Sequence, residues 1–286
     1  MKQGQPSKTA EWVARMRAAH QVLDAPPHVL EDPLAPRLLS AEQREALSRP
    51  DAAQQTPDAR ATRAFVVARS RYTEDLLARA VAAGVRQYVV LGAGLDTFAY
   101  RNPFPDLRLF EVDHPDTQAW KRERLAIAGI AEPRNLTFAA VDLESQSLVR
   151  GLAAAGFQGG EPAFFAWLGV TPYITRESFR DTLAFLSARP PGSGVAFDYA
   201  TPRRELEPAK QHTLDDVTRR VEGMGEPFQR YFSQEELAAE FDRVGFADVE
   251  DLDSEALHLR YFALREDGLE TRSAIGRLAS AWVRGR

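Results

Sequence analysis

Short apolar runs alternate with amphipathic segments through the middle of the chain. The apolar runs are typical of strands buried on both faces of a parallel sheet, and they lie at 87–91, 107–112, 136–141, 163–167 and 194–199. Between them, apolar residues recur at helical spacing over 117–128, 147–155 and 176–188. Strands and helices that alternate in this way predict βαβ units, and therefore an α/β fold with a mostly parallel sheet.

The two ends of the chain have different patterns. Before Gly84, a helical periodicity interrupted by prolines predicts helices over 11–22, 40–49 and 58–83. After residue 200 a charged, irregular segment precedes further elements: helices near 208–222 and over 233–244, then strands at 247–252 and 258–264. We therefore expect one structural domain with a seven-stranded sheet and helices on both faces. Residues 1–83 would form a helical cap on the substrate side, and 200–232 a lid-like insertion in the sheet-bearing part, 84–286.

The first predicted strand runs directly into a glycine turn. Gly92, Ala93 and Gly94 follow Val89-Val90-Leu91, and missing Cβ atoms let a backbone approach a ligand closely. The dinucleotide fingerprint has a third glycine at the sixth position, which is Thr97 here. This substitution disfavours a pyrophosphate and favours a ligand without phosphates. A tight strand-to-helix turn without a ligand is the alternative interpretation.

Acidic residues follow the next two predicted strands. Asp113 ends the second strand, at the distance from the glycine turn where an acid accepts hydrogen bonds from ribose hydroxyls. Glu111 alternates onto the same face, and Asp113 is preferred because it lies nearer the carboxyl end of the strand. After the third strand, Asp142 could accept from an adenine amino group while Leu143 packs on the ring, although Asp-Leu alone is also a helix-capping pattern. Together these features predict an adenosine site.

Composition narrows the chemistry further. The 286 residues include no cysteine, which excludes disulfides, cysteine-ligated metals and a thiol nucleophile. A formal net charge of −5 disfavours a nucleic-acid partner. No apolar run approaches the roughly 20 residues that span a bilayer, and no signal peptide is read, so we expect a cytoplasmic protein without a membrane partner. No metal site is predicted, because the adjacent acids Asp215 and Asp216 diverge on a helix.

Several segments resemble one family. The segment 90–101 (Val-Leu-Gly-Ala-Gly-Leu-Asp-Thr-Phe-Ala-Tyr-Arg) resembles the signature of the leucine carboxyl methyltransferase-like family of class I S-adenosylmethionine (SAM)-dependent methyltransferases. Other segments resemble motifs of that family in the same order: 32–35, 69–75, 110–115, 167–175 and, as its last strand, 261–264. The resemblance covers about residues 30 to 265. It implies a Rossmann-like, SAM-binding domain, and bacterial members are mostly assigned as small-molecule O-methyltransferases.

The resemblance also implies roles for individual residues. Arg69 or Arg71 would pair with the methionine carboxylate of SAM. The other implied cofactor contacts are Gly92, Ala93, Gly94, Asp96, Glu111, Asp113, His114, Asp142, Leu143, Ala166, Trp167 and Leu168. Some members carry Glu where this chain has Leu168, so a charged contact to the cofactor's ammonium group is missing at that position.

The methyl acceptor is less well defined. A carboxylate acceptor is ionised at pH 7 and needs no base, whereas a phenol benefits from one. Tyr173 and Tyr199 follow the fourth and fifth strands, and His212 lies in the 200–232 insertion; these are candidates without a catalytic motif. We expect methyl transfer to a carboxylate or phenolic oxygen of a small molecule. The alternatives are a protein C-terminal carboxyl methyltransferase, an NAD-dependent oxidoreductase and a non-catalytic SAM-binding protein.

Overall fold

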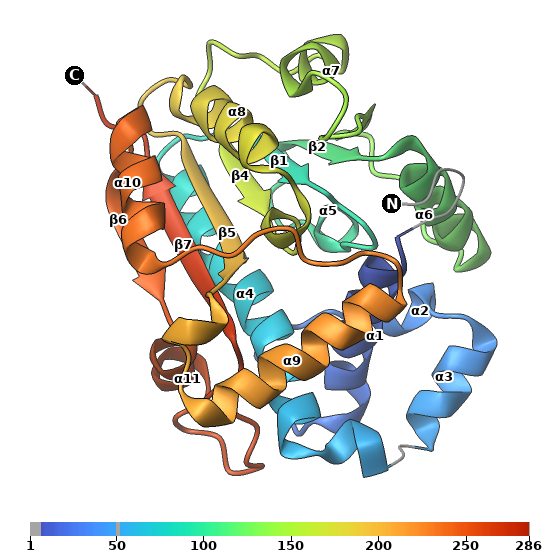
Figure 1. Cartoon of the computed structure of the whole chain (residues 1–286). Coiled ribbons are helices and arrows are strands. Elements are labelled where there is room, and N and C mark those ends of the chain that lie inside the picture. Colours follow the sequence, from blue (N-terminus) through green and yellow to red (C-terminus); the bar gives the residue numbers. More distant parts are fainter. Residues whose placement is uncertain (1–6, 50–51, 286) are drawn as a thin grey trace.

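The computed structural model describes residues 7–49 and 52–285, and a seven-stranded sheet forms its centre (Figure 1). The strands are β1 (Gln87–Leu91), β2 (Arg108–Asp113), β3 (Leu136–Ala140), β4 (Phe164–Trp167), β5 (Gly194–Ala200), β6 (Ala247–Leu252) and β7 (Gly276–Trp282). Their order is β3-β2-β1-β4-β5-β7-β6. Strands β1 to β5 are parallel, and β7 runs antiparallel between β5 and β6. The predicted α/β fold with a seven-stranded, mostly parallel sheet is confirmed.

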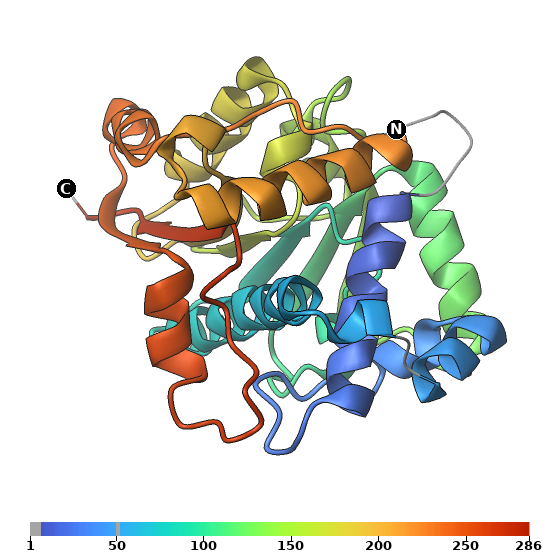
Figure 2. The same ribbon diagram turned by 60° about the horizontal axis from the view of Figure 1, so that its bottom comes forward.

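Helices cover both faces of the sheet (Figure 2). They are α1 (Lys8–Leu23), α2 (Ala35–Leu38), α3 (Ala41–Ser48), α4 (Pro57–Ala82), α5 (Phe98–Arg101), α6 (Pro115–Ile127), α7 (Leu148–Ala154), α8 (Arg176–Ser187), α9 (Pro208–Gly223), α10 (Gln234–Val244) and α11 (Ser254–Tyr261). One apolar core lies between the sheet and α7, α8 and α10, and a second between the sheet and α4, α5 and α11. Successive side chains of a strand point to opposite faces of the sheet, so Val89 and Leu91 of β1 enter the first core and Tyr88 enters the second.

The prediction of a last strand at 258–264 is wrong. Residues 254–261 form helix α11, and the chain's final strand is β7, at 276–282. The Asp253 side chain accepts a hydrogen bond from the Ala256 N–H and so caps a helix at this point. Leu257 and Phe262 are buried against α4 and the sheet. The strand pattern was missed because Gly276, Ser280 and the alanines of β7 have weak strand propensity.

The loop before β7 is tied to the N-terminal segment by Asp267. Its carboxylate accepts hydrogen bonds from the Arg265 guanidinium and from the N–H groups of Leu269 and Ala25. The Arg265 hydrogen bonds lower the pKa of Asp267 to about 2. No helix within 7–49 and 52–285 has both the length and the apolar character needed to cross a bilayer.

Asp267→Asn is expected to destabilise the protein in a pH-dependent way. Because the folded-state pKa lies below the ordinary value, the carboxylate's contribution to the free energy of unfolding is present above about pH 4 and is lost as the pH falls toward 2. Urea unfolding at pH 5, 3.5 and 2.5 should therefore show a stability difference between wild type and variant that shrinks toward acid. A difference that stays constant over this range would contradict the ionic role.

Candidate active site

A cavity of about 540 Å³ lies at the carboxyl ends of the parallel strands. The strand order reverses between β1 and β4, and open α/β sheets bind ligands at this switch point. On the sheet side, its walls come from the ends of successive strands and the loops that follow them, at 92–96, 113–114, 141–144, 168–170 and 198–200. The glycine turn and the acidic strand ends identified in the sequence thus surround one space.

The turn after β1 has a backbone shape that favours glycine. Gly92 has φ +67° and Gly94 has φ +46°. A Cβ atom on Gly92 would lie 2.2 Å from Cγ2 of Val170. The N–H groups of Gly92 and Ala93 both donate to the Val112 carbonyl, at 2.8 and 3.1 Å, and so tie the turn to β2. Bare backbone therefore forms this part of the cavity wall.

Gly92→Ala is expected to lower the free energy of unfolding more than Gly129→Ala does. The two glycines have similar φ, +67° and +63°, so both substitutions carry left-handed backbone strain of about 1–2 kcal/mol. A Cβ atom on Gly129 meets nothing within 4 Å, whereas that on Gly92 overlaps Val170. Overpacking should add about 1–3 kcal/mol at Gly92 alone. Urea unfolding of both variants measures the difference, and equal losses would show that the close approach to Val170 is unimportant.

Asp113 presents its carboxylate to the cavity at the end of β2. Its Oδ2 accepts from the Gly94 N–H at 2.5 Å, and its Oδ1 accepts from the His114 N–H at 2.7 Å. Burial raises the pKa of the Asp113 carboxyl, and the two backbone donors oppose that shift by favouring the charged form. A carboxylate has about four acceptor positions. Asp113 therefore retains capacity for further donors, such as the two hydroxyls of a ribose.

Glu111 is placed away from the cavity. Its carboxylate is buried and forms an ion pair with Lys121 of α6 at 2.5 Å. Burial raises the pKa of Glu111 to about 7, and the Lys121 ammonium opposes that shift. Both acids lie on one face of β2, but only Asp113 reaches the strand end beside the glycine turn. Of the two acids that the sequence left open for the ribose contact, Asp113 is the one that lines the cavity.

The loop after β3 brings Asp142 and Leu143 to the cavity wall. The Asp142 carboxylate accepts hydrogen bonds from the Ser145 hydroxyl at 2.7 Å and the Glu144 N–H at 3.0 Å. Burial alone would raise the pKa of Asp142, but these hydrogen bonds lower it. Asp142 therefore stabilises its own turn and also lines the cavity.

Arg69 and Arg71 occupy different environments on α4. Arg69 is buried, lines the cavity and forms an ion pair with Asp198 of β5 at 2.6 Å. Arg71 is exposed, pairs with Asp75 one helical turn later and does not line the cavity. Of the two guanidiniums suggested by the resemblance, Arg69 is the one that lines the cavity. Asp198 was not identified from the sequence, although an acid inside an otherwise apolar strand was the available signal.

The remaining candidates divide between the cavity wall and other places. Ala93, Asp96, His114, Ala166 and Leu168 line the cavity. Trp167 is instead buried in the core, stacked on Phe179. His212 is exposed on α9 and is absent from the cavity wall.

Tyr173 and Tyr199 line the cavity, but the Tyr199 hydroxyl already donates to Asp251 at 2.7 Å. Burial raises the pKa of both tyrosines, so their hydroxyls stay protonated at neutral pH.

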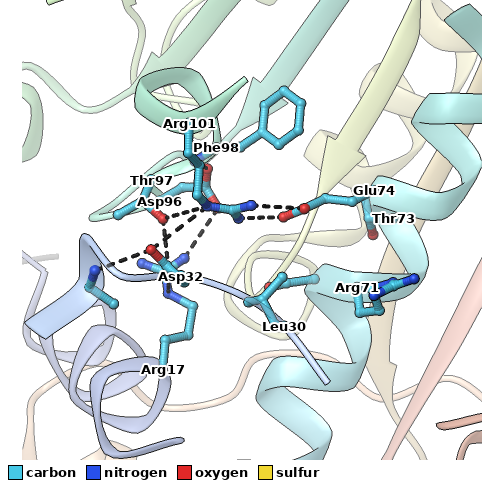
Figure 3. Close-up of polar contacts among 12 residues, drawn as sticks. Arg17, Leu30, Asp32, Arg71, Thr73, Glu74, Asp96, Thr97, Phe98 and Arg101 are labelled. Atoms are coloured by element: carbon cyan, nitrogen blue, oxygen red, sulfur yellow. Dashed lines mark hydrogen bonds and ion pairs between the residues drawn. The ribbon is translucent and has the colours of Figure 1, made fainter. Parts of the chain in front are cut away.

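A buried polar cluster holds the glycine turn in place (Figure 3). Arg17 of α1 donates to the Leu95 carbonyl and, at 3.1 Å, to Asp96. Asp32 lies 3.7 Å from the Arg17 guanidinium and accepts a hydrogen bond from the Thr97 hydroxyl at 2.6 Å. Thr97 occupies the position of the third glycine in the dinucleotide fingerprint. Here its hydroxyl anchors the segment around Asp32 instead.

Arg101 extends this cluster to α4. Its guanidinium donates to both oxygens of Glu74, and its Nε lies 3.7 Å from Asp32 (Figure 3). The cluster therefore joins α1, α4 and α5 to the turn between them. Sequence analysis did not predict it, because its members are scattered over residues 17–101 and no local periodicity pairs them.

Side chains from outside the sheet close the rest of the cavity. They are mostly apolar or aromatic and include Trp12, Val13, Phe65, Val66, Tyr173, Pro227 and Phe228. We call this set the aromatic chamber. Its rings pack on one another, as Tyr173 and Phe228 do edge to face with centroids 5.2 Å apart.

Two distant segments meet over the aromatic chamber. The Glu226 carboxylate, in the loop after α9, accepts hydrogen bonds from the Ser7 hydroxyl at 2.9 Å, the Lys8 N–H at 2.8 Å and the Thr9 hydroxyl. The Arg220 guanidinium also lies over the Trp12 ring, 5.6 Å from its centroid. Figure 2 shows α9 crossing beside the N-terminal end of α1. The cavity is thus covered where these segments touch.

The residues present fit an adenosine-containing cofactor with an amino-acid end. The glycine turn leaves room that a Cβ atom would fill, and Asp113 retains acceptor capacity. In the part of the chain that the structure describes, the Arg69 guanidinium donates one hydrogen bond, from Nη1 to Asp198, so it keeps further donors for an anion. Among those same residues, no group of three or more histidines and acids is placed to hold a metal ion.

Comparison with known protein families shows to which family this chain is related. A family model described as leucine carboxyl methyltransferase matches residues 10–187. The chain belongs to the leucine carboxyl methyltransferase family. The matched region runs from α1 to α8 and includes the glycine turn, the buried polar cluster and strands β1 to β4. The chain is accordingly a methyltransferase enzyme, as the sequence resemblance implied.

Individual relatives agree with this assignment. A Bacillus subtilis (strain 168) protein named "Putative S-adenosyl-L-methionine-dependent methyltransferase YktD" is 32% identical over 212 residues, which cover 73% of this chain and 69% of that protein. A Mycolicibacterium gilvum (strain PYR-GCK) protein with the same description is 37% identical over 162 residues, about half the length of that relative (51%). Among solved structures, a "putative methyltransferase" from Thermobifida fusca YX shares the fold, with a TM-score of 0.61 at 17% identity over 99% of this chain and 97% of that one.

Proposed function

We propose that this enzyme binds SAM in the cavity and transfers its methyl group to a carboxylate or phenolic oxygen of a small organic molecule. The observation that carries the proposal is that one cavity joins two chemically different halves. The sheet side offers the glycine turn, Asp113 and Arg69, and the other side is the aromatic chamber. A polar nucleoside and an apolar acceptor could therefore lie in contact.

Each part of the cavity has a proposed role in holding the cofactor. Asp113 would accept from the ribose hydroxyls, Asp142 from the adenine amino group, and Leu143 would pack on the ring. Arg69 would take the methionine carboxylate through a charge-assisted hydrogen bond. When bound, SAM supplies an activated methyl carbon on its sulfonium, which a nucleophilic oxygen can take up. The chain's own task is then to orient the acceptor and exclude water, and orientation alone is worth about 7–11 kcal/mol.

We assign acceptor binding to the aromatic chamber. Its aromatic side chains suit an apolar body, and the cationic side chains of the cavity, Arg17 and Arg69, are already paired with Asp96 and Asp198. The contact of Ser7 and Thr9 with Glu226 covers the chamber, so the N-terminal helices act as a cap and the 200–232 segment as a lid. A chamber that is covered where these segments touch favours a small molecule over the C-terminus of a folded protein.

Methyl transfer from labelled SAM tests this proposal. The wild type is incubated with aromatic carboxylic acids, with phenols and with peptides that end in leucine. We expect label in one of the two small-molecule classes and none in the peptides. Label confined to a peptide carboxyl group would overturn the acceptor assignment, and failure of S-adenosylhomocysteine (SAH) to bind would overturn the cofactor assignment.

A further inference from the structure

A buried carboxylate stands beside the guanidinium that we assign to the cofactor. Asp198 is 6% exposed and Arg69 is 7% exposed, and both side chains line the cavity. Asp198 Oδ2 accepts from Arg69 Nη1 at 2.6 Å, and Oδ1 accepts from the Gly169 N–H at 2.5 Å. The cavity wall therefore holds an adjacent cation and anion, each fixed in place by the fold.

Both members of this pair retain hydrogen-bonding capacity. A guanidinium has five donors, and within 7–49 and 52–285 Arg69 donates one hydrogen bond, from Nη1 to Asp198. A carboxylate has about four acceptor positions, and the structure assigns two hydrogen bonds to the Asp198 carboxylate. Arg69 and Asp198 can therefore hydrogen-bond to each other and to a ligand at the same time.

The backbone is built to bring these groups together. Gly169 has φ +71°, and a Cβ atom there would lie 3.0 Å from Arg69 Nη2, so a glycine lets the guanidinium approach the loop. The same residue donates its N–H to Asp198. Gly169 in the loop after β4 therefore contacts both members of the pair, the Arg69 guanidinium of α4 and the Asp198 carboxylate of β5.

An α-amino acid carries its carboxylate and ammonium on one carbon, so it is complementary to an adjacent cation and anion. We propose that Asp198 accepts a hydrogen bond from the α-amino group of the cofactor's methionine part, while Arg69 takes the carboxylate. The inference rests on the proposed binding of SAM in this cavity. Asp198 would then supply the ammonium contact from β5, beside the guanidinium that takes the carboxylate.

Calorimetric titration with three ligands tests this role. The ligands are SAH, its deaminated analogue without the α-amino group, and 5′-methylthioadenosine, which lacks the whole amino-acid end. The variant is Asp198→Asn, which keeps the size and the acceptor oxygen of the side chain but removes its charge. We expect it to weaken SAH binding by about 10- to 100-fold, the range for a hydrogen bond between charged groups. The other two ligands should change by less than about 3-fold.

Glu240→Gln is the matched control. Glu240 is also a buried acid paired with an arginine, Arg180, at 2.6 Å, but it does not line the cavity. This variant should bind all three ligands as the wild type does. Should Asp198→Asn fail to fold, the wild type still gives a test, because the deaminated analogue must bind at least about 10-fold more weakly than SAH.

Three results would overturn the inference. Equal loss of all three ligands in Asp198→Asn would assign Asp198 a purely structural role. Unchanged SAH binding in that variant, or equal affinity of the wild type for SAH and its deaminated analogue, would assign the amino group to other partners. In each of these cases SAM binding itself stands. If the wild type binds neither SAH nor 5′-methylthioadenosine, the proposed function falls and this inference falls with it.

Discussion

Asp32→Ala is expected to lower the free energy of unfolding by about 3–5 kcal/mol, the usual effect of removing one partner from a buried ion pair. Asp32 is fully buried and lies 3.7 Å from both Arg17 and Arg101. It also accepts from the Thr97 hydroxyl at 2.6 Å and the Ala35 N–H at 3.1 Å. Without it, two guanidiniums and a hydroxyl lose a buried partner, and such groups are expensive to leave unpaired.

Urea unfolding of Asp32→Ala and of Asp248→Asn measures this effect. Asp248 forms an ion pair with Arg284 in which both side chains are more than half exposed. Exposed pairs contribute about 0–1 kcal/mol, so the control should remain close to the wild type. Similar losses in the two variants would contradict the claim that the buried polar cluster supports the glycine turn.

Asp113→Ala is expected to reduce SAH affinity by about 100-fold or more. Two hydroxyl hydrogen bonds to a carboxylate contribute about 1.5–3 kcal/mol each, and each 1.4 kcal/mol is a factor of ten in the dissociation constant. The substitution also removes the acceptor for the Gly94 N–H, which loosens the turn at the cavity wall. Both consequences act in the same direction.

Calorimetric titration of SAH into this variant provides the measurement, with Glu123→Gln as the control. Glu123 is an exposed acid on α6 that does not line the cavity, so its substitution should leave affinity unchanged. Near-UV circular dichroism establishes that both variants are folded. An Asp113→Ala protein that is folded and binds SAH as tightly as the wild type would remove Asp113 from the proposed ribose contact.

The parallel half of the fold was readable from the sequence because its signals are local. The strands β1 to β5 are short apolar runs bounded by turn residues. The helix predicted over 233–244 is likewise present as α10, with Ser233 as its N-cap. The last strand was not readable. The alanines and the serine of β7 form a strand because their backbone pairs with β5 and β6 on either side, which is a tertiary effect.

The residues of the candidate site were likewise predictable only where the sequence signal is local. Glycines and acids at strand ends are local features, so the sequence identified Gly92, Gly94 and Asp113 as one group, and the structure places all three around one cavity. It could not separate Arg69 from Arg71, because their difference depends on β5 supplying Asp198 to one of them. The covering contact of Ser7 and Thr9 with Glu226 joins residues that are far apart in the sequence, 219 positions in the case of Ser7, and has no local signal.

A crystal structure of the enzyme with SAH tests the central claim most directly, because that claim is about where the two halves of one cavity meet. The account predicts that the ribose hydroxyls contact Asp113, that the amino-acid end lies beside Arg69, and that the sulfur faces the aromatic chamber at Tyr173 and Phe228. A complex in which SAH binds outside this cavity, or in which its sulfur faces away from the aromatic chamber, would contradict the account.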